Sequence, residues 1–218
     1  EATGIADYPA ITRKMADKFM DLGGEIRLGT ALKSARETPD EIVLQTTGGE
    51  IHAKRVIACA GIMADRVADM LGVETGFKMV PFRGEYYQLP PSKNNIVKHL
   101  IYPIPDPELP FLGVHLTRMI DGSVTVGPNA VLAFAREGYP KGSFNMGDMM
   151  DMARYGGFWK LMKANIGTGI SEMKDSFFKS GYLERCRKYC PELTLEDLQP
   201  YPAGIRAQAV TKDGSLIH

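Results

Sequence analysis

The strongest constraint on the fold is a change of pattern near Met79. From that residue onward, extended runs of apolar and polar side chains are separated by prolines and by an Asp121-Gly122 pair. Such runs, joined by turn-forming residues, are typical of antiparallel strands linked by short loops. We expect strands at residues 81–89, 97–102, 111–118 and 123–126. The middle of the chain therefore predicts an antiparallel sheet.

A helix is expected before this sheet, at residues 10–22. Its apolar residues recur at intervals of three and four, Pro9 precedes it and Gly23-Gly24 follow it. These are the start and stop signals of an amphipathic helix. Short strands are expected next, with Gly48-Gly49 as a hairpin turn, at residues 25–28, 41–46 and 51–52.

Residues 56–60 form an apolar run without alternation, followed by Gly61 and a helical pattern over residues 64–71. This predicts a strand that is buried on both faces and leads into a helix, as in α/β proteins. Small residues at the end of such a strand leave room for a ligand against the backbone. Close packing of the helix on the strand explains Ala60-Gly61 equally well.

Helices are expected between residues 147 and 198. The pattern is interrupted at Gly156-Gly157 and ends at Pro191, and a final strand pair is expected at 204–217. Gly167-Thr168-Gly169 follows a helix rather than a strand, so we interpret it as a turn and not as a dinucleotide-binding loop. Four methionines at helical spacing are expected in the core, with an adaptable binding surface as the alternative: Met149, Met150, Met152 and Met162.

Composition narrows the functional classes. The 218 residues are 44% hydrophobic and 24% charged, which is typical of a globular protein. The 26 basic and 26 acidic side chains give no net charge, which disfavours nucleic-acid binding. No apolar run reaches the ~18 residues of a membrane-spanning helix. Three cysteines, an odd number, favour a reducing compartment, so we expect the cytoplasm. The four histidines are scattered, and we expect no metal site.

The densest polar cluster lies at the start of the predicted sheet. If the strands alternate regularly, Arg83, Glu85 and Tyr87 share one face, and His115 shares another with Thr117. Arginine binds carboxylates in a bidentate manner, and histidine exchanges protons near neutral pH. The cluster can therefore bind a carboxylate substrate and remove its hydroxyl proton. A solvated face on which Arg83 pairs with Glu85 explains the same residues, and the sequence favours neither.

Nine short segments carry a resemblance to a known family. Two of them are Phe82-Arg83-Gly84-Glu85-Tyr86 and Gly127-Pro128-Asn129-Ala130-Val131, and the others lie at residues 7–10, 23–26, 59–61, 101–107, 111–115, 117–123 and 202–208. Together they resemble bacterial L-2-hydroxyglutarate dehydrogenases, also called oxidases. The resemblance covers nearly the whole chain. It places the chain near D-amino-acid oxidase, glycine oxidase and glycerol-3-phosphate dehydrogenase.

The resemblance implies an α+β (mixed α/β) fold. That fold is the substrate-binding half of a two-part flavoprotein, with a mixed, largely antiparallel sheet covered by helices, plus part of the Rossmann-like FAD-binding half. It implies FAD-binding elements at residues 1–78, a substrate-binding domain at 79–200 and a return towards the FAD-binding half at 201–218. The chain begins at Glu1 and has no G-x-G-x-x-G fingerprint. We therefore expect a central segment of a longer enzyme, inactive and without FAD by itself.

The resemblance also suggests residue roles in the oxidation of L-2-hydroxyglutarate to 2-oxoglutarate, with hydride transfer to FAD. His115 is the expected base. The expected contacts to the dicarboxylate substrate are Arg83, Tyr87, Tyr102, Thr117, Arg118, Asn129 and Arg206. The expected contacts to the cofactor are Leu32, Ala60, Gly61, Gly84 and Glu85.

Two other functions stay open from the sequence alone. One is a flavin-dependent oxidase of a small amino acid such as glycine or sarcosine. The other is an interaction domain without catalytic activity. Both a quinone and oxygen are compatible as electron acceptor, and a peripheral position on the inner membrane is the alternative to a purely cytoplasmic one.

Overall fold

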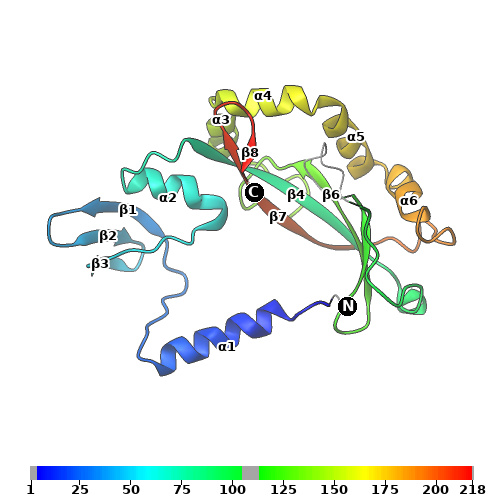
Figure 1. Cartoon of the computed structure of the whole chain (residues 1–218), viewed down its shortest axis with the longest axis horizontal. Coiled ribbons are helices and arrows are strands. Elements are labelled where there is room, and N and C mark those ends of the chain that lie inside the picture. The colour runs from blue at the N-terminus through cyan, green and yellow to red at the C-terminus, as the bar shows by residue number, and fades with distance from the viewer. Residues whose placement is uncertain (1–3, 105–112, 218) are drawn as a thin grey trace. The chain divides into compact units, whose positions relative to one another are not determined.

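A computed structural model describes residues 4–104 and 113–217 (Figure 1). These residues form two compact units. The first, the N-terminal unit, is Ile5–Thr75. The second, the sheet unit, comprises the described residues from Gly76 onward.

The N-terminal unit begins with helix α1, Tyr8–Asp21. The Asp7 side chain accepts a hydrogen bond of 2.9 Å from the backbone N–H of Ala10 and so caps the helix. Pro9 occupies the first turn, where its missing N–H costs nothing. The predicted helix is confirmed, and its apolar residues Ile11 and Phe19 are exposed.

Three antiparallel strands follow: β1 at Leu32–Glu37, β2 at Ile42–Thr46 and β3 at Gly49–Ala53. The predicted hairpin is confirmed, because Thr46 pairs with Gly49 across the turn. Gly49 has a φ of 110°, which L-side chains rarely adopt. The strand expected at 25–28 is absent from the described sheets, and β1 lies further along the chain.

The prediction of a buried strand at residues 56–60 is wrong. These residues are not in a strand, and the Ile57 side chain is 90% exposed. A strand buried on both faces needs strands beside it to pair its backbone groups, and neither described sheet offers one to this segment. The helix predicted next is confirmed as a short 3-10 turn, η1 at Gly61–Met63, that continues into α2 at Ala64–Met70.

The sheet unit contains the predicted antiparallel sheet. Its strands are β4 at Phe77–Gln88, β5 at His115–Arg118, β6 at Val124–Leu132, β7 at Gln199–Thr211 and β8 at Leu216–Ile217. A short 3-10 turn, η2 at Pro91–Lys93, follows β4. The order across the sheet is β5-β6-β4-β7-β8, and all neighbours are antiparallel. Of the strand expected at 97–102, only Ile101 pairs, in an isolated bridge with Leu116. β7 pairs with β4 along its length, so residues 199–211 belong to this sheet.

Four helices run in a row along one side of this sheet (Figure 1): α3 at Met146–Ala153, α4 at Gly156–Ala164, α5 at Ile166–Phe177 and α6 at Lys179–Arg187. The predicted break at Gly156-Gly157 is confirmed, since α4 begins there. The turn predicted at 167–169 is wrong, because these residues lie in the first turn of α5. Glycine costs less at a helix end than in its interior, so the Gly-x-Gly pattern does not stop this helix.

The core consists of two clusters between the sheet and the helices. One joins Val80 and Val210 to α3 and α4, and Met149, Met152 and Met162 belong to it or pack against it. This confirms the core interpretation for three of the four methionines, whereas Met150 is 43% exposed. The other cluster joins Tyr87 and the strands β5 and β6 to α6.

Two β-bulges flank the middle of β4. From Glu85 to Tyr87 of β4, the partner residue on β6 changes from Asn129 to Val126, which is three positions. From Gly84 to Tyr86, the partner on β7 changes from Gly204 to Tyr201, also three positions. The extra residue therefore lies in β6 and in β7, and β4 itself runs on without one.

Candidate functional site

A cavity of ≈ 380 Å³ lies in the sheet unit where four strands meet at the bulge. It is lined by Phe82, Gly84, Tyr86, His115, Pro128, Asn129, Ala130, Gly204, Ile205 and Arg206. Strands β4, β5, β6 and β7 each contribute to this wall. Four of the residues predicted from the sequence therefore meet in one place: Gly84, His115, Asn129 and Arg206.

His115 begins β5 and is half-buried. Its Nδ1 lies 3.3 Å from the carbonyl oxygen of Gly113. Because a carbonyl can only accept, Nδ1 carries the proton, and the neutral ring then has a lone pair on Nε2. Burial lowers the pKa of His115, which outweighs the opposing effect of the Gly113 carbonyl. The imidazole is thus neutral at pH 7 and able to accept a proton.

Arg206 and Tyr86 provide the hydrogen-bond donors of the wall. Burial raises the pKa of the Tyr86 phenol, and the positive charge of Arg206 acts in the opposite direction. The two groups are therefore close enough to interact electrostatically. A guanidinium beside a neutral phenol presents a cation and an O–H donor, the combination that suits a carboxylate.

Glu85 and Asn129 form a reciprocal pair beneath the bulge. The Glu85 backbone N–H donates to Asn129 Oδ1 at 3.0 Å, and Asn129 Nδ2 donates to Glu85 Oε2 at 3.1 Å. Both residues are buried, and they face each other across β4 and β6. The Asn129 side chain thus satisfies the backbone N–H at the bulge.

Arg83 forms an ion pair with Glu85, and both side chains are largely buried. Its Nε also donates to the Tyr139 carbonyl at 3.0 Å, and Lys141 Nζ lies 3.7 Å from Glu85 Oε1. Of the two sequence interpretations, the structure thus shows the one in which Arg83 pairs with Glu85. Arg83 lies outside the cavity wall.

Other residues predicted to contact substrate lie elsewhere in the described residues. Tyr87 is in the core, 4.9 Å from the ring of Tyr182 between centroids. The face of β4 that carries Arg83, Glu85 and Tyr87 does not border the cavity, which is lined by the alternate residues Phe82, Gly84 and Tyr86. Tyr102 is 52% exposed, and neither it nor Thr117 and Arg118 on β5 line the cavity.

The residues predicted to contact the cofactor divide between the units. Gly84 lines the cavity, whereas Glu85 is engaged beneath it. Leu32 begins β1 in the N-terminal unit, and Ala60 precedes Gly61 at the start of η1. Gly61 has a φ of 52°, a conformation that favours glycine.

The structure adds cavity residues that the sequence did not single out, chiefly Tyr86, Pro128 and Ile205. The available signal was weak. Tyr86 stands beside Tyr87 in the sequence. Alternation separates the two tyrosines, but the sequence does not show which face of the strand borders a cavity.

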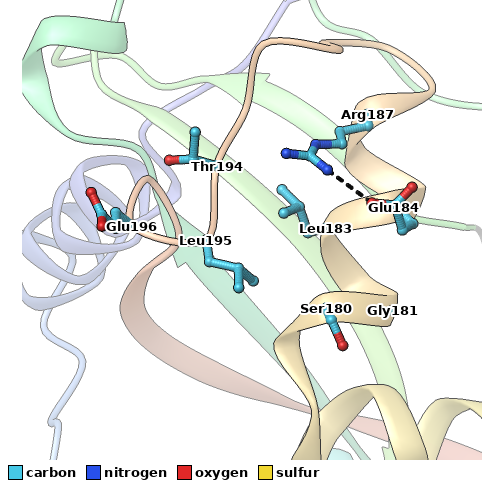
Figure 2. A pocket seen from close by; sticks show the side chains of 8 residues that line it. All are labelled: Ser180, Gly181, Leu183, Glu184, Arg187, Thr194, Leu195 and Glu196. Carbon is cyan, nitrogen blue, oxygen red and sulfur yellow. Dashed lines mark hydrogen bonds and ion pairs between the residues drawn. The ribbon is translucent and has the colours of Figure 1, made fainter.

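Two further cavities contain none of the site residues predicted from the sequence. Figure 2 shows an open one of ≈ 660 Å³ between α6 and residues 194–196, where Arg187 and Glu184 form an ion pair at 3.0 Å. A largely apolar one of ≈ 260 Å³ between β6, α4 and α5 shares Phe82 and Ala130 with the first cavity.

Two properties can be stated for the described residues. No cluster of three or more histidine, cysteine or acidic side chains there is arranged to hold a metal ion. No helix there combines the length and apolar character needed to cross a bilayer.

Along the sequence, a smaller unit of helices and strands precedes an antiparallel sheet that is covered by helices. The sheet has a cavity with a cationic residue, Arg206, beside the bulges. The family model of the FAD dependent oxidoreductases named DAO matches residues 1–218, and the chain belongs to this family. Within it, the chain is 54% identical over 217 residues to an L-2-hydroxyglutarate dehydrogenase of Escherichia coli K12, with 99% of this chain and 51% of the relative covered. It is 39% identical over 227 residues to the mitochondrial L-2-hydroxyglutarate dehydrogenase of Homo sapiens, covering 99% and 49%.

The chain spans about half the length of the curated relatives it matches. Solved structures confirm the fold. An L-α-glycerophosphate oxidase from Mycoplasma pneumoniae matches with a TM-score of 0.63 at 16% identity, covering 91% of this chain and 44% of that one. A glycine oxidase from Bacillus cereus matches with a TM-score of 0.57 at 12% identity, covering 95% and 45%.

Proposed function

We propose that the protein containing this chain oxidises L-2-hydroxyglutarate to 2-oxoglutarate with FAD as its cofactor. The observation that carries the proposal is the cavity at the bulge, where Arg206, His115 and Tyr86 meet. The likeness to L-2-hydroxyglutarate dehydrogenases over 99% of the chain supports this substrate.

The cavity wall suits a flat aromatic cofactor. Gly84 and Gly204 leave part of the wall without side chains, and a Cβ at Gly84 would come within 3.0 Å of the Pro128 Cβ. Backbone without side chains permits the close approach of a ring. We propose that Gly84 borders the ring, and that Leu32, Ala60 and Gly61 of the N-terminal unit hold the adenosine part. When bound, FAD supplies the acceptor for the hydride from C2 of the substrate.

The chain's own residues bind the substrate and take its proton. Arg206 binds a carboxylate through charge-assisted hydrogen bonds. Nε2 of His115 accepts the proton of the C2 hydroxyl, since Nδ1 is held by the Gly113 carbonyl. The C–H electron pair leaves C2 as hydride while the hydroxyl oxygen becomes the carbonyl of the 2-oxo acid. Tyr102, Thr117 and Arg118 lie outside the cavity wall and have no part in this proposal.

Steady-state kinetics of the full-length flavoenzyme test the proposal. We expect activity on L-2-hydroxyglutarate, with a shorter 2-hydroxy acid as the poorer substrate. Arg206→Leu is expected to lower kcat/KM about 30- to 800-fold, the effect of losing ~2 to 4 kcal/mol of charge-assisted binding. Arg36→Leu, which removes an exposed arginine of β1, is the control and should change kcat/KM less than twofold. Activity on glycine or sarcosine without activity on hydroxy acids would instead establish an amino-acid oxidase.

We also propose that the protein works in the cytoplasm. Cys59, Cys186 and Cys190 are all free thiols, which suits a reducing compartment. For the electron acceptor, both a quinone and oxygen stay open. Stopped-flow reoxidation of the reduced enzyme with each in turn would show which one reacts within the turnover time.

A further inference from the structure

We infer that Tyr86, and not its neighbour Tyr87, is a substrate-binding residue, and that the Glu85–Asn129 pair holds β4 against the bulge of β6 where Tyr86 borders the cavity. The inference rests on the proposed function, because it assigns the Tyr86 hydroxyl to a carboxylate of the hydroxy-acid substrate. It names a contact and a positioning pair that the sequence alone does not reveal.

The two adjacent tyrosines have opposite surroundings. Tyr86 is half-buried and lines the cavity together with Arg206. Tyr87 is 7% exposed, packs edge-on against Tyr182, and has Lys179 Nζ 5.2 Å from its ring centroid. Successive residues of a strand point to opposite faces, so only one of the two can reach the cavity.

The position of the Tyr86 ring follows from the backbone around it. Cβ atoms built at Gly84 and Gly127 would lie 3.5 and 2.9 Å from carbons of this ring. The ring therefore occupies the space that glycine leaves free at both positions. Its hydroxyl makes no hydrogen bond to any described residue, and Arg206 acts on it electrostatically. An O–H donor beside a guanidinium is suited to bind the second oxygen of a carboxylate that Arg206 holds.

The bulge depends on buried polar contacts that have no place in the reaction itself. The Glu85 N–H, which faces the shifted register, finds its acceptor in the Asn129 side chain at 3.0 Å. Asn129 Nδ2 returns a hydrogen bond of 3.1 Å to the Glu85 carboxylate, whose charge is balanced by Arg83. Both ends of the Asn129 amide are engaged, so it cannot rotate freely. Glu85 and Asn129 are accordingly positioning residues, and the element they position is the part of strand β4 that carries Tyr86.

The test compares Tyr86→Phe with Tyr87→Phe in the full-length flavoenzyme, each of which removes one hydroxyl. Binding of glutarate, a dicarboxylate that cannot be oxidised at C2, is measured by titration of the flavin absorbance. The KM for L-2-hydroxyglutarate is measured alongside it. We expect Tyr86→Phe to weaken both about 10- to 100-fold, the loss of a hydrogen bond to a charged group, with kcat within about threefold. Tyr87→Phe should change neither by more than about twofold.

A double-mutant cycle tests the positioning pair. Asn129→Ala alone should weaken glutarate binding about 5-fold or more, but in the Tyr86→Phe background it should add less than about twofold, because it acts through Tyr86. Fully multiplied effects would mean that Asn129 touches the substrate itself, and that part of the inference would be wrong.

Three results overturn the assignment of Tyr86. They are unchanged glutarate binding in Tyr86→Phe, equal losses in Tyr86→Phe and Tyr87→Phe, and loss of FAD without a change in glutarate affinity. Failure of the proposed function has a different signature, since the unmodified enzyme would then not oxidise L-2-hydroxyglutarate at all, and the inference would fall with it.

Discussion

Removal of the Arg83 guanidinium tests how the charges beneath the cavity are held. The ion pair between Arg83 and Glu85 is largely buried, with 14% and 8% of the two side chains exposed. Arg83→Met keeps most of the aliphatic volume and removes the charge. The Glu85 carboxylate then retains the hydrogen bond from Asn129 and a longer contact of 3.7 Å to Lys141.

The expected cost follows from this geometry. Breaking a buried ion pair by removing one partner costs about 3 to 5 kcal/mol, because the remaining charge stays buried without its partner. Lys141 reduces this penalty, although its side chain is 52% exposed and its charge is screened by water. We expect a loss of about 2 to 4 kcal/mol in the free energy of unfolding. For a unit of this size, that lowers Tm by roughly 6 to 12 °C.

Differential scanning calorimetry of the 218-residue chain measures the shift. Lys14→Met is the control, since it breaks the exposed pair Lys14–Asp17 and should cost less than about 0.5 kcal/mol. Arg83→Met combined with Glu85→Gln should recover part of the loss, because the double variant leaves no buried carboxylate uncompensated.

A Tm for Arg83→Met within about 1 °C of the control would refute the reasoning. It would mean that Arg83 does not balance Glu85 in solution. The alternative considered from the sequence, in which this arginine clamps the substrate, would then regain its place.

Three further predictions concern single residues. In the full-length enzyme, kcat/KM should fall as the pH drops below the ordinary histidine pKa of about 6.5, because protonation removes the base. His115→Asn should lower kcat about 10²- to 10⁴-fold and abolish this fall at low pH. An unchanged fall in the variant would exclude His115 as the base. In NMR titrations of the chain, the pKa of His52 should lie above the ordinary value, since Glu41 and Glu50 accept from its ring, whereas burial places the pKa of His115 below it; the reverse order would contradict the surroundings described for both rings. Gly127→Ala should lower the free energy of unfolding in urea by about 2 to 4 kcal/mol. The reason is that φ is 142° there, and the new Cβ would lie 2.8 Å from the Glu85 carbonyl oxygen and 2.9 Å from the Tyr182 hydroxyl. A loss below about 1 kcal/mol would show that the bulge in β6 can relax.

Local sequence determined several elements because their signals lie within one element. Asp7 and Pro9 start α1, Gly48-Gly49 turn the hairpin, and Gly156 separates two helices. Each signal acts through capping, missing donors or permitted φ, which neighbouring residues alone decide. The resemblance of short segments identified the family for the same reason, since motifs are local strings.

Pairing between distant strands decided the rest. The run at 56–60 is apolar enough for a buried strand, but a strand exists only where another offers its hydrogen-bonding edge. The Gly-x-Gly at the start of α5 is helical because the helix packs on β6.

The candidate site shows the same division most clearly. The sequence predicted Arg206, His115 and Gly84 as site residues, and the structure brings them together at one cavity. It favoured the face of β4 that carries Arg83 and Tyr87, whereas the opposite face, with Gly84 and Tyr86, lines the cavity. Alternation separates the two faces of a strand, but only its partners decide which face borders a cavity. Those partners, β6 and β7, lie far along the chain. Chemical character is thus determined locally, whereas the surroundings of each face are decided by tertiary pairing.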